Sequence, residues 1–222
     1  MNKFINALLL FILLPTMAFS VVVGFDLPLE FLRTTGGQIA YKFEIFLGFG
    51  LLLLIINVRR SVRRWMGMRI VNQTNKFLWN QPVSLERKKR VYVYTILEAF
   101  VMLCVGSALY YVTSSAILPA IAFWYATADN LIFLLVGSRK NRFRAGITKK
   151  AVVVADRDVS VLYFSGLRKV SIHQDTIYFD YIKTLQLYFP LDCIEKEERD
   201  SFFSTLEAQL DPNKVFVTRQ RN

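Results

Sequence analysis

Four long apolar blocks constrain this 222-residue chain more than any other feature of its sequence. Each block is close to the roughly 20 residues that a helix needs to cross a hydrocarbon core of roughly 30 Å. A buried helix of a soluble protein would normally be shorter and would carry polar residues on one face. The hydrophobic fraction of 54% is also high for a soluble domain. The sequence therefore predicts an α-helical membrane protein with four transmembrane helices, at about 4–25, 39–58, 91–112 and 117–137.

The first apolar block also has features of a cleavable signal peptide. Lys3 precedes an apolar core, and the small residues Ala18 and Ser20 follow it. However, the apolar run continues through Val23 to Phe25, which is longer than the core of most signal peptides. We therefore predict an uncleaved first span, with cleavage as the alternative. Either outcome leaves the predicted orientation of the other spans unchanged.

The basic residues are distributed unevenly along the chain, whose formal net charge is +11. Residues 1–150 carry 19 Lys and Arg against 6 Asp and Glu, whereas residues 151–222 carry 9 against 11. Within the first part, the basic residues gather in the connector 58–90 and directly after the fourth span. Because Lys and Arg collect on the cytosolic side of a membrane, the pattern predicts that both termini face the cytosol.

A basic chain also suggests nucleic-acid binding, but the position of the charge argues against it. A nucleic-acid site would require a basic patch on a folded soluble surface. Here the basic residues flank membrane spans and the soluble tail is slightly acidic. We therefore expect no nucleic-acid partner, and we interpret the basic residues as a topology signal that also attracts anionic lipid headgroups.

The connector 58–90 is too long for a simple link between two spans. Its arginines recur at helical spacing, and Val62, Trp65, Met66 and Ile70 can form an opposite apolar side. This pattern predicts a helix that leaves the bilayer and lies in its interface, followed by a second surface segment at Phe77–Trp79. The predicted lipid-surface residues are Arg59, Arg60, Arg63, Arg64, Trp65 and Arg69. Their role is either a simple anchoring collar or the recognition of an anionic lipid or acidic partner.

Two carboxylates, Glu98 and Asp129, lie well inside apolar blocks. They are roughly 12 and 15 Å from the cytosolic ends of their helices, so an antiparallel hairpin would place them at similar depth. Asp129 shares a helix face with Ala122 and Ala126, which would allow close helix packing. No Lys or Arg is expected at that depth within the predicted spans.

Charged groups in hydrocarbon are costly, so these carboxylates should face a bundle interior, a partner subunit or water. Three interpretations remain open. Glu98 and Asp129, with the neighbouring Asn130, could lock the hairpin, contact another membrane subunit, or line a proton or cation path.

After Gly137 the sequence changes to short alternating apolar runs, which are typical of β-strands. We expect six strands, at 143–147, 151–155, 159–164, 168–173, 176–182 and 185–189. One amphipathic helix follows, with Asp192 and Glu195 in the spacing of a capping box. Phe202, Phe203 and Leu206, together with Leu210, form its expected buried stripe. The predicted domains are a membrane domain (1–138), a small cytosolic β-rich domain (139–211) and a C-terminal tail (212–222).

The run Phe143–Val154, the Phe164–Val170 turn into a strand, and the terminal helix at Glu195–Leu210 resemble bacterial pleckstrin-homology-like domains. The resemblance covers the C-terminal third of the chain and rests on the order of elements. Those domains have seven strands, one more than this sequence predicts. The resemblance implies a binding or assembly module without enzymatic activity, in the inner membrane of a bacterium. Phosphoinositide binding is not carried over, because no matching basic motif is present.

The sequence offers few groups for catalysis or metal binding. His173 is the single histidine and falls in a predicted strand, and the two cysteines are far apart in the chain. No phosphate-cradling glycine loop, nucleophile elbow or paired-histidine motif occurs. We therefore predict no catalytic, cofactor-binding or metal-binding residues.

These observations predict a non-enzymatic accessory or scaffold subunit in the plasma membrane. It would bind a protein partner or an anionic lipid surface through its cytosolic face, within a membrane complex or a homo-oligomer. The first alternative is a small transporter or a proton- or cation-conducting subunit that uses Glu98 and Asp129. The second alternative is a lipid-modifying enzyme at the interface.

Overall fold

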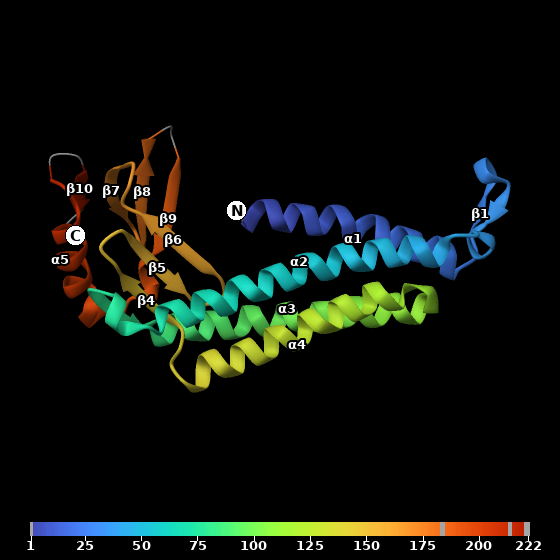
Figure 1. Cartoon of the computed structure of the whole chain (residues 1–222), viewed down its shortest axis with the longest axis horizontal. Helices are drawn as coiled ribbons and strands as arrows, with labels where there is room; N and C mark the ends of the chain where they lie inside the picture. The colour runs from blue at the N-terminus through green and yellow to red at the C-terminus, as the bar shows by residue number, and fades with distance from the viewer. Residues whose placement is uncertain (1, 183–184, 213–214, 220–222) are drawn as a thin grey trace. The chain divides into compact units, whose positions relative to one another are not determined.

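The computed structural model describes residues 2–182, 185–212 and 215–219. Within these residues, four helices are long and apolar enough to cross a membrane, as many as the sequence predicts. The helices are α1 (Asn2–Gly24), α2 (Lys42–Val71), α3 (Leu85–Val112) and α4 (Ile117–Arg139) (Figure 1).

Two of these helices are longer than the apolar blocks that predict them. α2 continues without interruption past Val58 to Val71, and α3 begins at Leu85, before the expected start at Val91. The helix expected in the first part of the connector is present as the last turns of α2, which carry its arginines. Arginine is a good helix former, so hydropathy falls at Arg59 while helix propensity does not.

The chain divides into two compact units, which are described separately. The helical unit comprises Met1–Val62 and Thr95–Ile132, and the β-rich unit comprises Arg63–Tyr94 and Phe133–Asn222. The division falls within α2, α3 and α4, so each of these helices contributes one end to the β-rich unit.

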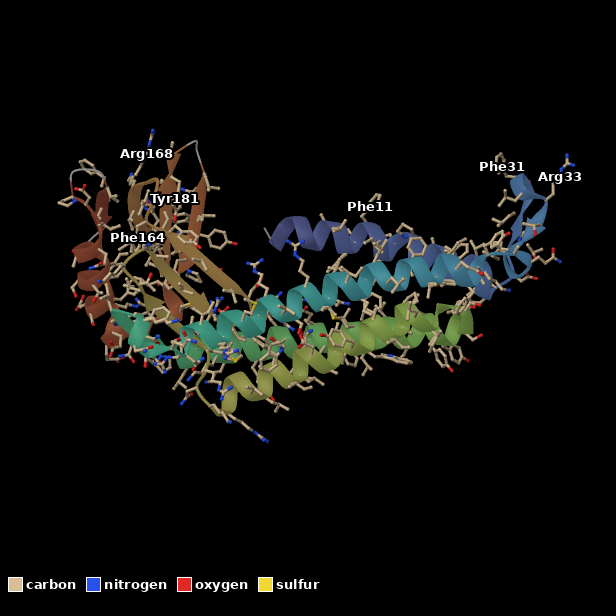
Figure 2. The ribbon with its side chains drawn as sticks, in the orientation of Figure 1. Phe11, Phe31, Arg33, Phe164, Arg168 and Tyr181 are labelled. Carbon is tan, nitrogen blue, oxygen red and sulfur yellow. The ribbon has the colours of Figure 1, made fainter. Side chains whose placement is uncertain are left out.

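The helical unit has a core built from α1, α2, α3 and α4, with Phe46, Leu53, Leu109 and Phe123 among its buried residues. In α4, 50% of the membrane-spanning window is buried, against 28% or less in the other three helices, so α4 is the most enclosed helix. Phe11 on α1 is 75% exposed and points outward (Figure 2), as expected of a side chain that faces lipid. A two-stranded antiparallel sheet of β1 (Pro28–Leu29) and β2 (Thr34–Thr35) links α1 to α2.

The β-rich unit contains all six strands that the alternating pattern predicts. They are β4 (Arg144–Ile147), β5 (Ala151–Ala155), β6 (Val159–Tyr163), β7 (Leu167–His173), β8 (Thr176–Tyr181) and β9 (Gln186–Pro190). Two further strands were not expected. They are β3 (Trp79–Pro82) and β10 (Phe216–Arg219), the second of which pairs in parallel with β7. Within the predicted tail, residues 213–214 and 220–222 lie outside the described residues.

These strands form two four-stranded sheets, ordered β3-β4-β5-β6 and β10-β7-β8-β9. β3 precedes α3 in the chain, whereas its antiparallel partner β4 follows α4. The α3–α4 hairpin is therefore inserted between two paired strands of one sheet. The Phe77–Trp79 segment, expected on the membrane surface, instead leads into this sheet.

A single apolar core holds the two sheets and the helix α5 (Arg199–Gln209) together. Trp79 from β3 is 7% exposed and meets the Phe202 ring edge-on, with 5.1 Å between ring centroids. Phe189 from β9 stacks on the other side of the same cluster, 5.7 Å from Phe202. The predicted buried stripe of this helix is confirmed, since Phe202, Phe203, Leu206 and Leu210 are all buried.

The capping box predicted for this helix is wrong. α5 begins at Arg199, and its cap residue Glu198 makes no side-chain capping bond. Glu195 is used elsewhere: its carboxylate accepts a hydrogen bond from the backbone N–H of Leu85, at 2.9 Å. The carboxylate therefore caps the start of α3, where unpaired N–H groups favour an acceptor.

Candidate functional site

The two carboxylates within the apolar helices, Glu98 and Asp129, both have partners on α2. The guanidinium of Arg60 donates to Glu98 on α3 and forms an ion pair with it. The Ser61 hydroxyl donates to Asp129 on α4, at 2.7 Å. Adjacent residues of one helix therefore engage the carboxylates of two other helices.

The pairing of Glu98 with Arg60 corrects the expectation that no cation lies at the depth of the carboxylates. That expectation assumed that the second span ends at Val58, which would leave Arg60 outside the helical bundle. Because α2 continues to Val71, Arg60 stays on the helix and reaches Glu98. The ion pair lowers the cost of placing either charge in an apolar environment.

Further polar contacts join the same three helices. The Asn57 amide donates to the carbonyl of Ala122, at 3.1 Å, and the Thr127 hydroxyl donates to that of Ala99, at 3.3 Å. Asn130, which is 1% exposed, points its amide toward the sulfur of Met102, at 3.8 Å. The predicted close packing around Ala122 agrees with these contacts, since that residue is fully buried. The polar groups thus form cross-links between helices.

Three more of the predicted lipid-surface residues contact other parts of the protein. Arg64 is 2% exposed, and its guanidinium lies 4.8 Å from the centre of the Phe133 ring. Arg63 donates to the carbonyl of Val159 in β6, at 2.8 Å, and Trp65 meets Phe133 edge-on. Arg59 and Arg69 are exposed. The last turns of α2 therefore carry protein contacts on one face and leave apolar Val62, Met66 and Ile70 exposed on another.

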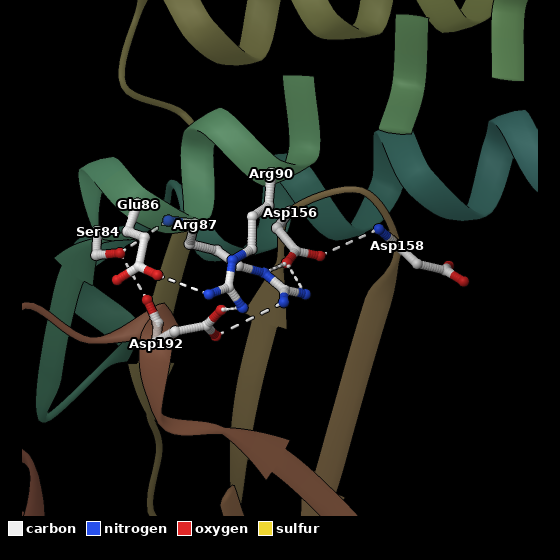
Figure 3. A network of polar contacts seen from close by, with 7 residues as sticks. All are labelled: Ser84, Glu86, Arg87, Arg90, Asp156, Asp158 and Asp192. Atoms are coloured by element: carbon white, nitrogen blue, oxygen red, sulfur yellow. Dashed lines mark hydrogen bonds and ion pairs between the residues drawn. The ribbon is translucent and has the colours of Figure 1, made fainter. Parts of the chain in front are cut away.

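A second group of charges lies at the start of α3, in the β-rich unit (Figure 3). Arg87 binds Asp156 in the β5–β6 turn through Nε and Nη2, both at 2.7 Å, and lies 3.6 Å from Asp192. Arg90 binds the other oxygen of Asp192 at 2.9 Å and Glu86 at 2.6 Å. The carboxylate of Asp156 is 8% exposed, so its charge depends on Arg87.

Ser84 completes this network and starts the helix. Its hydroxyl accepts from the backbone N–H of Arg87, at 3.0 Å, which is the capping geometry of a helix N-terminus. The same hydroxyl donates to the carbonyl of Asp192, at 2.6 Å. Segments from three parts of the sequence therefore meet at the first turn of α3. A local sequence pattern exists only for the Ser84 cap and the turn at Asp156. The ion pairs of Arg87 with Asp156 and Asp192 join residues far apart in the sequence and leave no local pattern.

Neither cysteine nor histidine adds a catalytic centre to this network. Burial raises the pKa of the Cys193 thiol well above its ordinary value, and nearby Asp156 raises it further against the opposing effect of Arg87. This thiol is therefore a poor nucleophile. His173 is exposed at the end of β7, beside Tyr178. Among the described residues, no group of His, Cys, Asp and Glu could hold a metal ion.

Comparisons of the chain with protein families, with curated proteins and with solved structures found no match.

Proposed function

We propose that this protein is a non-enzymatic accessory or scaffold subunit of the plasma membrane, with both termini in the cytosol. Its β-rich unit would be a pleckstrin-homology-like module that binds a protein partner. The four apolar helices would anchor it, and the basic residues after the second and fourth spans would fix its orientation.

The strand count supports the pleckstrin-homology-like interpretation. β3 to β6 form four strands of one sheet, and β7 to β9 form three consecutive strands of the other. Together, β3 to β9 are seven strands, and helix α5 follows them. Six of these strands were predicted from the C-terminal sequence, and β3 is the seventh. That strand comes from the connector before α3, so the membrane hairpin interrupts the module after its first strand.

The observation that carries the partner-binding proposal is the exposed edge of the β3-β4-β5-β6 sheet. β6 is its last strand and presents Val161, 37% exposed, and Tyr163, 60% exposed. The carbonyls of Val159 and Tyr163, at the two ends of β6, accept side-chain hydrogen bonds from Arg63 and Tyr181. The edge between them, with its exposed apolar side chains, is a surface to which an extended segment of another chain can add. Because the sheet is built from segments on both sides of the α3–α4 hairpin, a partner on β6 would be tied to the membrane part through two connections.

Site-specific photocrosslinking tests this proposal in cells. We expect a photoreactive p-benzoylphenylalanine at Val161 to give an adduct with one protein of defined mass. A matched variant carries the same group at Ala208, which is exposed on α5, a helix that contacts β3 and β4. Equal adduct patterns from the two positions, or none from Val161, would contradict a partner on β6.

The rival function is a proton or cation path through Glu98 and Asp129. The contacts favour the non-transport interpretation, because Arg60 balances the charge of Glu98 and Ser61 satisfies Asp129 within the bundle. We expect purified protein in proteoliposomes to give no proton flux above that of empty liposomes. A flux abolished by Glu98→Gln or Asp129→Asn would establish transport instead.

A further inference from the structure

A pocket of about 760 Å³ opens in the β-rich unit, apart from the charge network and from the middle of β6. It forms where the β4–β5 turn, the β6–β7 turn, the end of β8 and the segment after α5 meet. Its volume falls within the roughly 300–1,000 Å³ of small-molecule sites.

The floor and one wall of the pocket are apolar. Leu167, Leu210 and Val215 contribute buried side chains, and Tyr163 and Phe164 contribute aromatic rings. Such a lining favours a ligand with an apolar or aromatic body.

The rim of the pocket is cationic. Lys149 and Lys150 come from one turn and Arg168 from the start of β7, and all three are exposed. Among the described lining residues, Asp211 is the one acidic residue, which leaves an excess of two positive charges in this set. Arg168 sits where the pairing of β7 with β8 shifts register, between Leu167 and Lys169. A bulge of this kind re-aims a side chain, and Figure 2 shows Arg168 extending away from the strands.

The loops around the pocket are tied to one another before any ligand binds. The Phe164 N–H donates to the carbonyl of Lys150 at 2.8 Å, and the Ile182 N–H donates to that of Gly166 at 2.9 Å. The Tyr181 hydroxyl donates to the carbonyl of Tyr163 at 2.7 Å. Gly166 has a φ of 77°, which favours glycine at this turn. A preorganised site of this kind loses less entropy on binding.

Within the β-rich unit, the pocket lies at one end of β6, and Arg63 contacts the other end. Arg63 of α2 contacts Val159 at the start of β6, whereas Tyr163 at its other end lines the pocket. Four residue steps along a strand separate these positions by roughly 13 Å.

We propose that this pocket binds a phosphate monoester with an aromatic or apolar body. A phosphate monoester carries about −1.5 to −2 charges at pH 7, which matches the excess of two positive charges at the rim. The Arg168 guanidinium can bind two phosphate oxygens at once, and the two lysines supply point charges. The pocket shares Tyr163 with the proposed partner surface, but its test uses the isolated protein and does not require a partner.

Phenyl phosphate is a suitable probe, measured by saturation-transfer NMR on the full chain in nanodiscs of neutral phosphatidylcholine. We expect saturable binding that Arg168→Glu weakens by about tenfold or more, because a charge-assisted contact becomes repulsive. Lys169→Glu is the matched control. Lys169 is the next residue, is equally exposed and does not line the pocket, so the same change of net charge should leave binding within twofold.

The apolar part of the site has its own matched pair. Ile182 lines the pocket at 50% exposure, whereas Leu185 is 53% exposed and does not line it. Ile182→Ser should weaken phenyl phosphate but not inorganic phosphate, and Leu185→Ser should change neither. Both variants alter exposed side chains, and an unchanged melting temperature verifies their folding.

Equal losses from Arg168→Glu and Lys169→Glu would reduce the binding to nonspecific surface charge and overturn the proposal. A further arm adds phosphatidic acid to the nanodiscs, with salt held constant. Displacement of phenyl phosphate by this lipid in the wild type would assign the Arg168-dependent site to a lipid headgroup. Unchanged binding of phenyl phosphate would assign the site to a soluble phosphate monoester.

Discussion

At the scale of single residues, the charged side chains within the helices have defined partners. Glu98 and Asp129 stand out in the sequence as carboxylates in apolar blocks, and both engage α2 in the folded chain. Their position in apolar blocks predicted that both carboxylates need polar partners. It did not predict that Arg60 is the partner of Glu98, because hydropathy falls after Val58 although the helix continues through Arg60.

A double-mutant cycle tests the Arg60–Glu98 pair. Arg60→Met and Glu98→Leu should each destabilise the protein, because each leaves one charge in an apolar bundle without its counter-ion. The double variant should recover much of that loss, with a coupling free energy of about 1–3 kcal/mol. Thermal unfolding in nanodiscs, read by intrinsic fluorescence, measures all four proteins. Strictly additive effects would mean that the two side chains do not interact.

The Cys193 thiol makes stability depend on alkaline pH. Because its pKa is raised by folding, the unfolded chain loses this proton near the ordinary value of 9.0 while the folded chain keeps it. The contribution to stability is therefore fully present below pH 9 and declines as pH rises above it. We expect Cys193→Ala to flatten the fall of the melting temperature between pH 8.5 and 10.

Alkylation gives an independent check on the same thiol. In a Cys104→Ala background, iodoacetamide should label Cys193 at pH 8.5 only after denaturation, since the side chain is 1% exposed. Rapid labelling of the folded protein would contradict the burial of this group.

At the scale of elements, the start of α3 is held by charges from distant segments. Arg87 joins the first turn of this helix to the β5–β6 turn and to Asp192 (Figure 3). The strands β4 to β9 follow from short apolar runs between turn residues, although all five residues of β5 are buried. β3 does not, since a short strand with Pro82 at its end has no clear period and sits at the sheet edge.

Arg87→Met should destabilise the β-rich unit by about 3–5 kcal/mol, because it leaves the Asp156 carboxylate buried without its counter-ion. Arg90→Met is the comparison. The Arg90 side chain is 54% exposed, so its ion pairs should contribute about 1 kcal/mol or less. Melting temperatures of the two variants decide the ranking. A larger loss from Arg90→Met would show that the network is centred on Asp192 and not on Asp156.

The packing of α2 on α4 depends on one glycine of a pair. A Cβ atom added to Gly50 would lie 2.8 Å from the backbone of Leu118, whereas one added to Gly48 would meet nothing within 4 Å. Gly50→Val should therefore force the helices apart and cost about 1–3 kcal/mol, and Gly48→Val should cost little. Expression level and melting temperature in nanodiscs provide the readout. Similar behaviour of the two variants would contradict this helix contact.

At the scale of the whole molecule, the chain order links the membrane hairpin to the β-rich unit at both of its ends. The sequence predicted four spans and a β-rich C-terminal part, because long apolar runs and alternating runs are local signals. It did not predict that β3 and β4 pair across the α3–α4 hairpin, since Asn80 and Gly146 become neighbours only in the folded chain. The pocket behind Arg168 was missed for the same reason.

The central claim is that this protein works as a partner-binding subunit. Mild extraction from the native membrane, followed by native-gel migration and mass spectrometry, tests it most directly. We predict migration in an assembly larger than the 25.7 kDa chain, with a stoichiometric second protein that Val161→Lys releases and Ala208→Lys retains. Migration of the wild type alone or as a homo-oligomer, with no second protein, would contradict the claim.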